Sequence, residues 1–388
     1  MFRIPFRAKM KKKVIIDVAT IHPGQGGAGG GIWSYAGNLL LHLDQHIDTK
    51  NIDIVCLVNP RFNLPLKNLK KKEVQCNLRN FVVRFFYTNL YLPVYVYRQK
   101  AILHKLYFDS PILSLTKTLV TIHDCMGDFY RKKKYLTLSL SNRCKFIYFS
   151  LINKRAIKQS DFINTPSSFI KDEIINYYSV PGDKIIVTPL ATQENKEAFS
   201  KNKCSDTLNM YCVAAFHKHK GHLRLLEIFE TLVKMYAVNA HLYFRGHVGD
   251  KDYFEKIQSR IALSAVKERI HIFEYEKQSS LQEIYLGADW VILLSEYEGF
   301  GLPVIEAQAN KVPVICSDIP TFKEVAGDSV FYLEEKASVN EAAENLNSLL
   351  KNKNVKEQLI EHGLRNAARY NWDRMARQVL DIYIKALA

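Results

Sequence analysis

Apolar runs alternate with amphipathic stretches along most of the chain, and this alternation is typical of parallel βαβ units. In the first half we expect strands at 13–19, 53–58, 81–86, 102–107, 118–122 and 160–164. We expect helices there at 31–45, 89–99, 141–158 and 168–178. The second half predicts strands 209–215, 240–245, 269–273, 289–294 and 312–316, with helices 221–236, 251–263, 279–287 and 303–310. The pattern indicates an α/β fold with two doubly wound parallel sheets.

A polar stretch at 191–207 interrupts this alternation of strands and helices and indicates a linker between domains. The 388 residues suffice for two domains of ordinary size, which we place at 1–195 and 196–370. The closing segment 371–388 is amphipathic, and its apolar residues are expected to share one helix face: Trp372, Met375, Val379, Leu380 and Ile384.

Composition narrows the class of protein. A hydrophobic fraction of 47% and only 12 prolines favour a folded globular chain over a disordered one. The seven cysteines are scattered and include no C-x-x-C pair, so neither a disulfide framework nor a zinc ribbon is indicated, and a reducing cytosol is expected. The basic start is not expected to be a signal peptide because Asp17 interrupts its short apolar run, and no stretch approaches the roughly 20 apolar residues that span a bilayer.

The net charge of +15 is unevenly distributed. Residues 1–190 hold 29 Lys and Arg against 12 Asp and Glu, whereas residues 191–388 hold 25 against 27. This asymmetry suggests that the first half faces an anionic partner: a membrane surface, a phosphorylated lipid acceptor or nucleic acid. A basic surface kept for solubility is the simpler alternative.

Residues 289–327 carry the most specific motif. An apolar strand runs into Glu298, then into the turn Gly299-Phe300-Gly301-Leu302-Pro303, and then into a helix with Glu306 expected in its first turn. N–H groups at a helix start favour an anion, and glycines allow a ligand to approach the backbone closely. Two carboxylates beside an anion site suit a ligand with phosphates and hydroxyls, such as a sugar nucleotide. An ordinary strand–turn–helix would need no ligand.

The strings EGFGLPVIEA, VPVICSDIP and KEVAGD closely resemble the donor-binding motif of the retaining family-four glycosyltransferases, which have the GT-B fold. The resemblance implies two Rossmann-like domains around a central cleft, with the terminal helix crossing back to the first domain. It implies that Glu306 holds the nucleotide ribose, that Glu298 contacts the transferred sugar, and that the Phe300–Pro303 turn presents N–H groups to the donor. No Asp-x-Asp motif appears in a plausible donor context, so we expect neither a divalent metal nor another cofactor.

The glycine-rich stretch after the first strand formally matches a dinucleotide fingerprint, but the acidic residue expected after the second strand is missing. Gly30-Gly31-Ile32-Trp33-Ser34-Tyr35 instead resembles the family pattern G-G-I-x-x-Y. That resemblance implies a loop near the donor phosphates and the acceptor. A surface loop with no ligand is the alternative.

Two further elements match the family. Thr121-Ile122-His123-Asp124 follows an apolar strand, and the resemblance places His123 close to the donor sugar. In Phe216-His217-Lys218-His219-Lys220-Gly221, Lys220 matches a lysine that neutralises the leaving diphosphate. Ala215 stands where the family usually has an arginine, and Lys218, His219 or Arg245 are candidates to replace it.

Aromatic and basic residues interleave at 79–100 and 129–148. Such a mixture suits a membrane interface. We expect many of these aromatics to be core instead, because they fall in predicted strands and helices, and we expect the run Arg131-Lys132-Lys133-Lys134 to be the better surface candidate.

The sequence thus predicts a retaining glycosyltransferase that moves a hexose-type sugar from a nucleotide diphosphate sugar to a saccharide or lipid-linked saccharide in surface polysaccharide synthesis. It is expected in the cytoplasm or at the cytoplasmic face of a membrane, without a nucleic-acid partner. A phosphorylase or nucleotide-sugar epimerase of similar architecture remains an alternative. A basic nucleic-acid-binding protein is a weaker one, since no helix-turn-helix, zinc or RNA-recognition pattern supports it.

Overall fold

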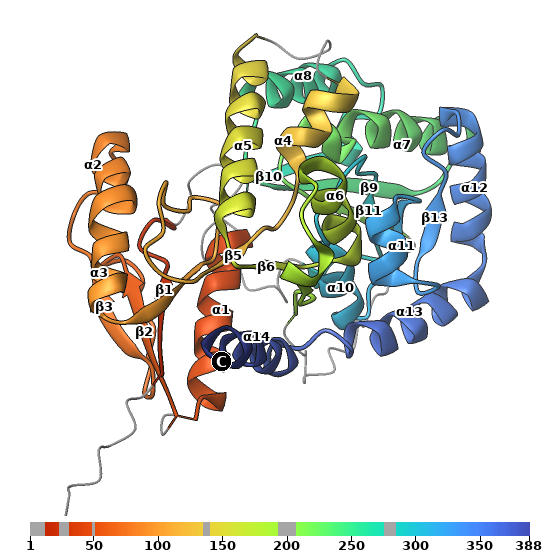
Figure 1. The fold of residues 1–388 in the computed structure, drawn as a ribbon. Coiled ribbons are helices and arrows are strands. Elements are labelled where there is room, and N and C mark those ends of the chain that lie inside the picture. Colours follow the sequence, from red (N-terminus) through yellow and green to blue (C-terminus); the bar gives the residue numbers. More distant parts are fainter. Residues whose placement is uncertain (1–11, 23–30, 49–50, 135–139, 193–206, 275–284) are drawn as a thin grey trace, which may run out of the picture. The chain divides into compact units, whose positions relative to one another are not determined.

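The computed structural model describes residues 12–22, 31–48, 51–134, 140–192, 207–274 and 285–388 (Figure 1). They form two compact units. Unit 1 comprises Met1–Pro166, Ile170–Thr188 and Asp373–Ala388, and unit 2 comprises Ser167–Phe169 and Pro189–Trp372. Most of the expected linker, residues 193–206, lies outside the described part of the chain.

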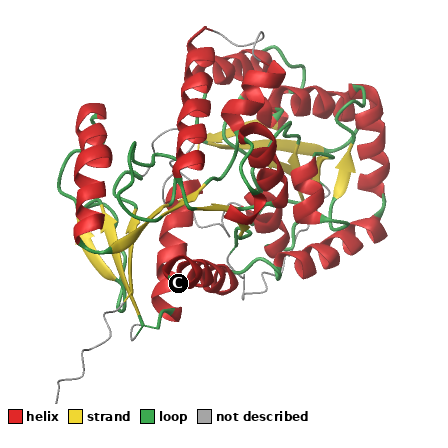
Figure 2. Ribbon diagram, in the orientation of Figure 1, coloured by secondary structure: helices red, strands yellow, loops and turns green. Residues whose placement is uncertain are grey.

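Unit 1 is built on a seven-stranded sheet in which every strand pair is parallel (Figure 2). The order is β3-β2-β1-β4-β5-β6-β7. The strands are β1 (Lys12–Asp17), β2 (Ile52–Val58), β3 (Lys70–Glu73), β4 (Ala101–Lys105), β5 (Thr118–Thr121), β6 (Phe162–Thr165) and β7 (Ile185–Val187). The strand order reverses between β1 and β4, where Asp17 aligns with Lys105.

The helical segments of unit 1 are α1 (Gly31–His46), α2 (Phe81–Phe86), η1 (Tyr87–Tyr91), α3 (Leu92–Arg98), α4 (Met126–Phe129), η2 (Tyr130–Lys134), α5 (Leu140–Gln159), most of α6 (Ser168–Tyr178), η4 (Gly182–Lys184) and α14 (Trp372–Leu387). The run α2–η1–α3 covers one face of the sheet, where its buried apolar residues join Ile15 of β1 and Leu103 of β4 in one core cluster.

The strand expected at 81–86 is wrong, because these residues form α2. The Asn80 side chain caps this helix by accepting hydrogen bonds from the backbone N–H groups of Val82 and Val83. A short apolar run does not separate strand from helix by itself. Here the cap and the burial of Tyr87 and Leu92 in the following helical turns favour the helix.

Helix α14 packs within unit 1, beside α1 (Figure 1). The imidazoles of His42 and His46 in α1 lie 2.8 and 2.7 Å from Oδ1 of Asp373. On the sheet, Nδ1 of His104 lies 2.6 Å from the Tyr383 hydroxyl. The buried face of α14 differs from the expected one at its end: Ile384 is exposed, whereas Tyr383 and Ala386 are buried.

Unit 2 contains a six-stranded sheet, again with all pairs parallel, in the order β10-β9-β8-β11-β12-β13. The strands are β8 (Leu208–Val213), β9 (Ala240–Gly246), β10 (Ile270–Glu274), β11 (Trp290–Leu293), β12 (Val314–Ser317) and β13 (Phe331–Leu333). Both sheets therefore follow the doubly wound order that the alternation predicted.

Helices cover both faces of this second sheet. One core cluster joins the strands to α7 (His222–Tyr236), α8 (Lys251–Ala262) and α12 (Val339–Lys351). The other joins them to α10 (Leu302–Ala309) and α11 (Pro320–Ala326). The remaining segments are η5 (Lys218–Lys220), η6 (Lys267–Arg269) and α13 (Lys353–Ala367). The helix expected at 279–287 falls largely on residues outside the described part.

Candidate active site

The order of the unit 2 sheet reverses between β8 and β11, so the segments that follow these strands meet at one edge. η5 with Lys220 follows β8, and the turn with Glu298 follows β11. The ammonium Nζ of Lys220 lies 2.6 Å from Oε1 of Glu298. Both side chains are about one-sixth exposed, at 17% and 15%. The structure therefore brings together two residues that the sequence placed in one site.

Two backbone contacts hold these segments against each other. Gly221 has φ of +71°, and a Cβ there would lie 2.1 Å from the Leu294 carbonyl oxygen. The N–H of Glu296 donates to the carbonyl of His219 over 2.8 Å. Only glycine combines this positive φ with so close an approach. Gly221 therefore sets where Lys220 lies relative to Glu298.

Hydroxyl groups position the Glu298 carboxylate and its turn. Ser295 Oγ donates to Oε1 over 2.7 Å, so this oxygen receives both Ser295 and Lys220. Thr321 and Ser167 donate to the carbonyls of Glu298 and Gly299, each over 2.8 Å. With both side-chain contacts on Oε1, Oε2 of Glu298 can accept hydrogen bonds from a ligand.

The turn before α10 requires glycine at Gly301, which caps the helix at φ +94°. A Cβ on Gly301 would lie 2.6 Å from the Phe322 ring. The helix begins at Leu302, so Pro303 is its second residue, where no intrahelical N–H is needed. Glu306 is the fifth residue, and its expected place in the first turn is wrong. The helix starts one residue earlier than expected because Gly301, not Leu302, takes the capping conformation.

Glu306 lies one helical turn after Leu302, the first residue of α10, and its side chain is partly buried. The Tyr285 hydroxyl donates to its Oε2 over 2.9 Å. Burial raises the pKa of Glu306 to about 7, and the Tyr285 hydrogen bond opposes that rise. A carboxyl with a pKa near neutrality gains from hydroxyl donors that favour its charged form. Glu306 is therefore suited to accept hydrogen bonds from a ligand diol.

The other basic candidates of unit 2 differ in their surroundings. Lys218 is exposed, whereas His219 is buried and stacks on His217 with ring centroids 5.5 Å apart. The Arg245 guanidinium lies over the rings of Tyr211 and Phe273, at 5.0 and 5.2 Å from their centroids. Among the described residues its buried Nε has no hydrogen-bond partner, so this N–H can donate to a ligand oxygen.

The candidates of unit 1 gather around His123. Its Nε2 donates to the carbonyl of Leu106 over 3.1 Å, and the Tyr35 ring packs edge-on at 4.7 Å. Burial lowers the pKa of His123 to about 4, so the ring is neutral at pH 7 with its proton on Nε2. Asp124 Oδ1 accepts from the N–H of Met126 over 2.9 Å, which fixes the turn after β5.

Of the glycine-loop candidates, Gly31 is the exposed first residue of α1 and Ile32 is partly buried. Gly30 lies outside the described residues. Tyr35 is buried, and its ring packs against the imidazole of His123.

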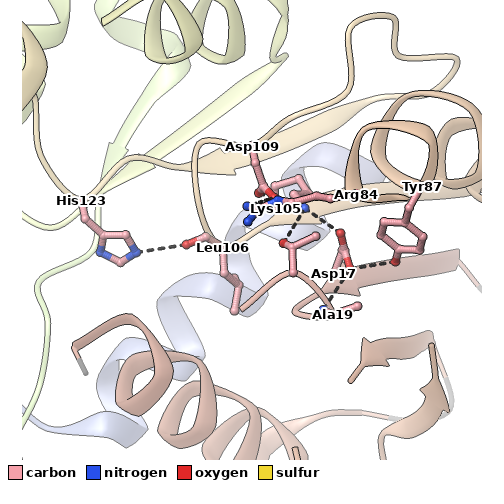
Figure 3. A network of polar contacts seen from close by, with 9 residues as sticks. Asp17, Ala19, Arg84, Tyr87, Lys105, Leu106, Asp109 and His123 are labelled. Atoms are coloured by element: carbon pink, nitrogen blue, oxygen red, sulfur yellow. Dashed lines mark hydrogen bonds and ion pairs between the residues drawn. The ribbon is translucent and has the colours of Figure 1, made fainter. Parts of the chain in front are cut away.

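A buried ionic network lies where β1 and β4 end in unit 1 (Figure 3). Lys105 Nζ lies 2.6 Å from Asp17 Oδ2 and 3.0 Å from Asp109 Oδ1. Arg84 lies 2.6 Å from Asp109 Oδ2, and the Tyr87 hydroxyl donates to Asp17 Oδ1 over 3.0 Å. Burial alone would lower the pKa of Lys105, but the two carboxylates outweigh it and raise that pKa.

Comparison with known proteins bears on the class of enzyme. Residues 193–365 match the family model described as "Glycosyl transferases group 1". This part of the chain is similar to that family. The matched segment contains Lys220, Glu298 and Glu306, so the contacts of these residues described above lie within it.

Curated relatives of this chain include the "O-antigen chain mannosyltransferase B" of Escherichia coli, 25% identical over 59% of this chain and 61% of the relative. Another is the "O-antigen chain mannosyltransferase RfbU" of Salmonella typhimurium, 27% identical over 68% of this chain and 69% of the relative. The chain thus spans about three-fifths to two-thirds of the length of these relatives.

Solved structures support the GT-B fold. The glycosyltransferase WaaG, "involved in lipopolysaccharide biosynthesis", has a TM-score of 0.70 at 13% identity and covers 95% of this chain and 99% of its own. A sucrose-phosphate synthase from Thermosynechococcus elongatus has a TM-score of 0.76 at 15% identity, covering 97% and 99%. At these identities the likeness concerns the fold alone.

Several residues around the candidate site were not predicted from the sequence. Ser295 and Tyr285 hydrogen-bond the two glutamates, and Lys105 joins Asp17 and Asp109. Serine and tyrosine give no spacing signal. Lys105 does give a sequence signal, because it ends a strand that is buried throughout. A buried lysine needs an acidic partner.

Proposed function

We propose that this glycosyltransferase moves a mannosyl residue, with retention, from a nucleoside diphosphate sugar to a saccharide or lipid-linked saccharide of a surface polysaccharide. The names of two relatives, both O-antigen chain mannosyltransferases, support the sugar and the polymer. The solved structure of Anabaena HepE "in complex with UDP and glucose" supports a nucleotide-sugar donor, with a TM-score of 0.69 at 12% identity.

The observation that carries the proposal is the contact between Lys220 and Glu298 in unit 2, the unit that also contains Glu306. Oε2 of Glu298 accepts from hydroxyls of the transferred sugar, and Oε1 of Glu306 accepts from the ribose. Lys220 lies at the diphosphate, where its charge balances the charge that grows on the leaving group. Arg245 and Lys218 are further donors to phosphate, with His219 supporting the turn that carries Lys220.

In the reaction, the bond between the sugar anomeric carbon and the diphosphate oxygen breaks as the acceptor hydroxyl attacks from the same face. The acceptor proton passes to the departing phosphate oxygen. Balance therefore requires no protein nucleophile. The backbone N–H groups of the turn before Pro303 hold the donor in position for this step. They belong to Gly299, Phe300, Gly301 and Leu302.

Within unit 1, His123 is the candidate for a ligand contact. Its neutral ring accepts a hydrogen bond from a ligand hydroxyl at Nδ1, because its Nε2 proton is committed to Leu106. Tyr35 and Asp124 position that imidazole. The reaction takes place at the cytoplasmic face of a membrane without a metal.

A panel of donors tests this proposal directly. GDP-mannose is expected to raise the melting temperature of the protein more than UDP-glucose or a dTDP-sugar does, because a ligand of the native state stabilises it. Mass spectrometry of an acceptor saccharide incubated with GDP-mannose should then show addition of one hexose. Release of free or isomerised sugar without an acceptor product would instead favour a phosphorylase or an epimerase. No shift with any nucleotide sugar would contradict the proposal.

A further inference from the structure

Residues 81–98 form one helical run, α2–η1–α3, that is apolar on both sides. Its inner side lies in the core of unit 1. The outer side exposes eight large apolar side chains by 42% to 68%: Phe81, Val82, Phe85, Phe86, Leu90, Tyr91, Val94 and Tyr97. A surface helix ordinarily carries polar residues on its outer face. We call these eight residues the apolar face.

The apolar face is continuous along the helical run. Val82, Phe86, Leu90 and Val94 follow one another at intervals of four residues, which aligns them along one side of a helix. Figure 1 shows α2 and α3 following each other as one helical column beside the sheet of unit 1. This contradicts the expectation that many aromatics of residues 79–100 are core, since Phe81, Phe85, Phe86, Tyr91 and Tyr97 are all exposed.

Positive charge surrounds the apolar face. The sequence from Val74 to Phe108 contains no aspartate or glutamate, and its exposed basic residues include Arg79, Arg98 and Lys100. On the neighbouring edge strand β3, Lys72 lies 4.0 Å from the centroid of the Tyr95 ring. Aromatic and aliphatic side chains within a basic rim match the two layers of an anionic bilayer surface, acyl chains beneath charged headgroups.

We propose that the apolar face is a membrane-binding surface, with the helical run lying in the plane of an anionic bilayer. The proposal goes beyond the transfer reaction and holds whichever sugar is moved. A second copy of the chain would fit the apolar residues but would oppose two basic rims with no acid from this stretch between them. Within the described residues, no helix has both the length and the apolar character to cross a bilayer, which suits a helix that lies on the surface.

The basic run after α4 is a weaker candidate for the same role. Arg131 lies 3.3 Å from the buried carboxylate of Asp128, and Lys132 lies 4.1 Å from the centroid of the Tyr177 ring. Both cations therefore have partners within the protein. The side chains of Lys133 and Lys134 lie outside the described part.

The test is co-sedimentation of the full chain with vesicles of phosphatidylcholine containing one-third phosphatidylglycerol, at low and high salt. The triple variant Val82→Gln, Phe86→Gln, Leu90→Gln should bind at least about tenfold more weakly than the unchanged protein, because three apolar side chains no longer enter the interface. A matched control, Leu113→Gln, Leu151→Gln, Leu263→Gln, removes three leucines elsewhere that are even more exposed and should bind as before.

Circular dichroism and the melting temperature establish that both triple variants fold. A second readout is the variant Phe85→Trp, in which the emission of the introduced indole should shift to the blue and be quenched by brominated lipid when vesicles are added. Equal vesicle binding by both triple variants, or no response of the introduced indole, would overturn the proposal. So would a concentration-dependent dimer of the unchanged chain that only the first triple variant abolishes, since a second copy would then occupy the face.

Discussion

The Lys220 ammonium lies 2.6 Å from Oε1 of Glu298, although 78 residues separate the two in sequence. The pair joins the segment after β8 to the segment after β11, at the point where the strand order of unit 2 reverses. Each charge is partly shielded from water and neutralised by the other. Neither partly buried charge is therefore left without a counter-ion.

Removal of either member of this pair should impair transfer. We expect Glu298→Gln to lower kcat/KM at least about a hundredfold, because the lost contacts act on the transferred sugar, and Lys220→Met to do so through the diphosphate. In a double-mutant cycle the two losses should not add, since the residues share one contact. Activity assays with purified, folded variants measure this, and additive losses would show that the two act separately.

Gly221→Ala tests the close approach that positions Lys220. The added Cβ would meet the Leu294 carbonyl oxygen at 2.1 Å in a backbone conformation of positive φ. The conformation alone costs about 1–2 kcal/mol for a residue other than glycine, and the clash adds to that. We expect a lower melting temperature together with reduced transfer. Gly37→Ala is the matched control, because a Cβ there meets nothing within 4 Å, and a similar loss in this variant would refute the steric argument.

The raised pKa of Glu306 predicts a pH dependence of donor binding. Burial moves this pKa from 4.5 to about 7, whereas ribose hydroxyls favour the charged carboxylate. Affinity for a nucleotide sugar should therefore rise severalfold between pH 6 and 8 and then level off. Nucleotide sugars are the proper ligand here, because their diphosphate diester does not titrate in this range. Calorimetry in buffers of different ionisation enthalpy should detect proton release on binding.

Two variants check that assignment. Glu306→Gln should bind more weakly with no pH dependence between 6 and 8, and Tyr285→Phe should move the transition to higher pH, because the lost hydrogen bond favoured the charged form. For stability the sign is opposite to that of a paired acid. The folded state holds the proton more tightly, so this contribution to the free energy of unfolding is present below pH 4.5 and is lost as the pH rises to about 7.

Lys105→Met should destabilise unit 1 strongly. It leaves the buried carboxylate of Asp17 without its cation, at a cost of about 3–5 kcal/mol for such a broken pair. Lys70→Met is the control, since the Lys70 side chain is 68% exposed and its pair with Asp53 is expected to contribute less than about 1 kcal/mol. Urea unfolding measures both free energies. Comparable losses in the two variants would contradict the importance of the buried network.

Chelation tests the expectation of a metal-free reaction. Transfer should persist in excess EDTA, because Lys220 supplies the positive charge at the leaving diphosphate. Loss of activity that one divalent cation restores would assign this role to a metal ion instead. A parallel assay of Lys220→Met with and without magnesium distinguishes the two sources of charge.

Much of this molecule follows from local sequence. Periodicity placed most strands and helices of both sheets, because parallel strands buried on both faces leave long apolar runs. The Gly299–Pro303 turn was predictable because its backbone geometry favours glycine and proline. Gly301 has a positive φ, and Pro303 lies in the first turn of α10. Resemblance in the same segment indicated the family that residues 193–365 match, since its motif is contiguous.

The errors fall where local sequence is ambiguous. Residues 81–86 suit a strand or a helix, and packing of the following turns in the core decided for the helix. The same helix exposes five aromatics that were expected in the core because they fall in predicted strands and helices.

By itself the sequence determined the alternation of parallel strands with helices and the residue types of the candidate site, because both depend on short-range periodicity and backbone geometry. The tertiary structure alone decided which of those residues touch. The contacts of Lys220 with Glu298, of Tyr285 with Glu306 and of Lys105 with Asp17 join segments that meet only through parallel pairing of distant strands. Spacing along the chain carries no information about such contacts, since it is the strand order of each sheet that brings them into reach.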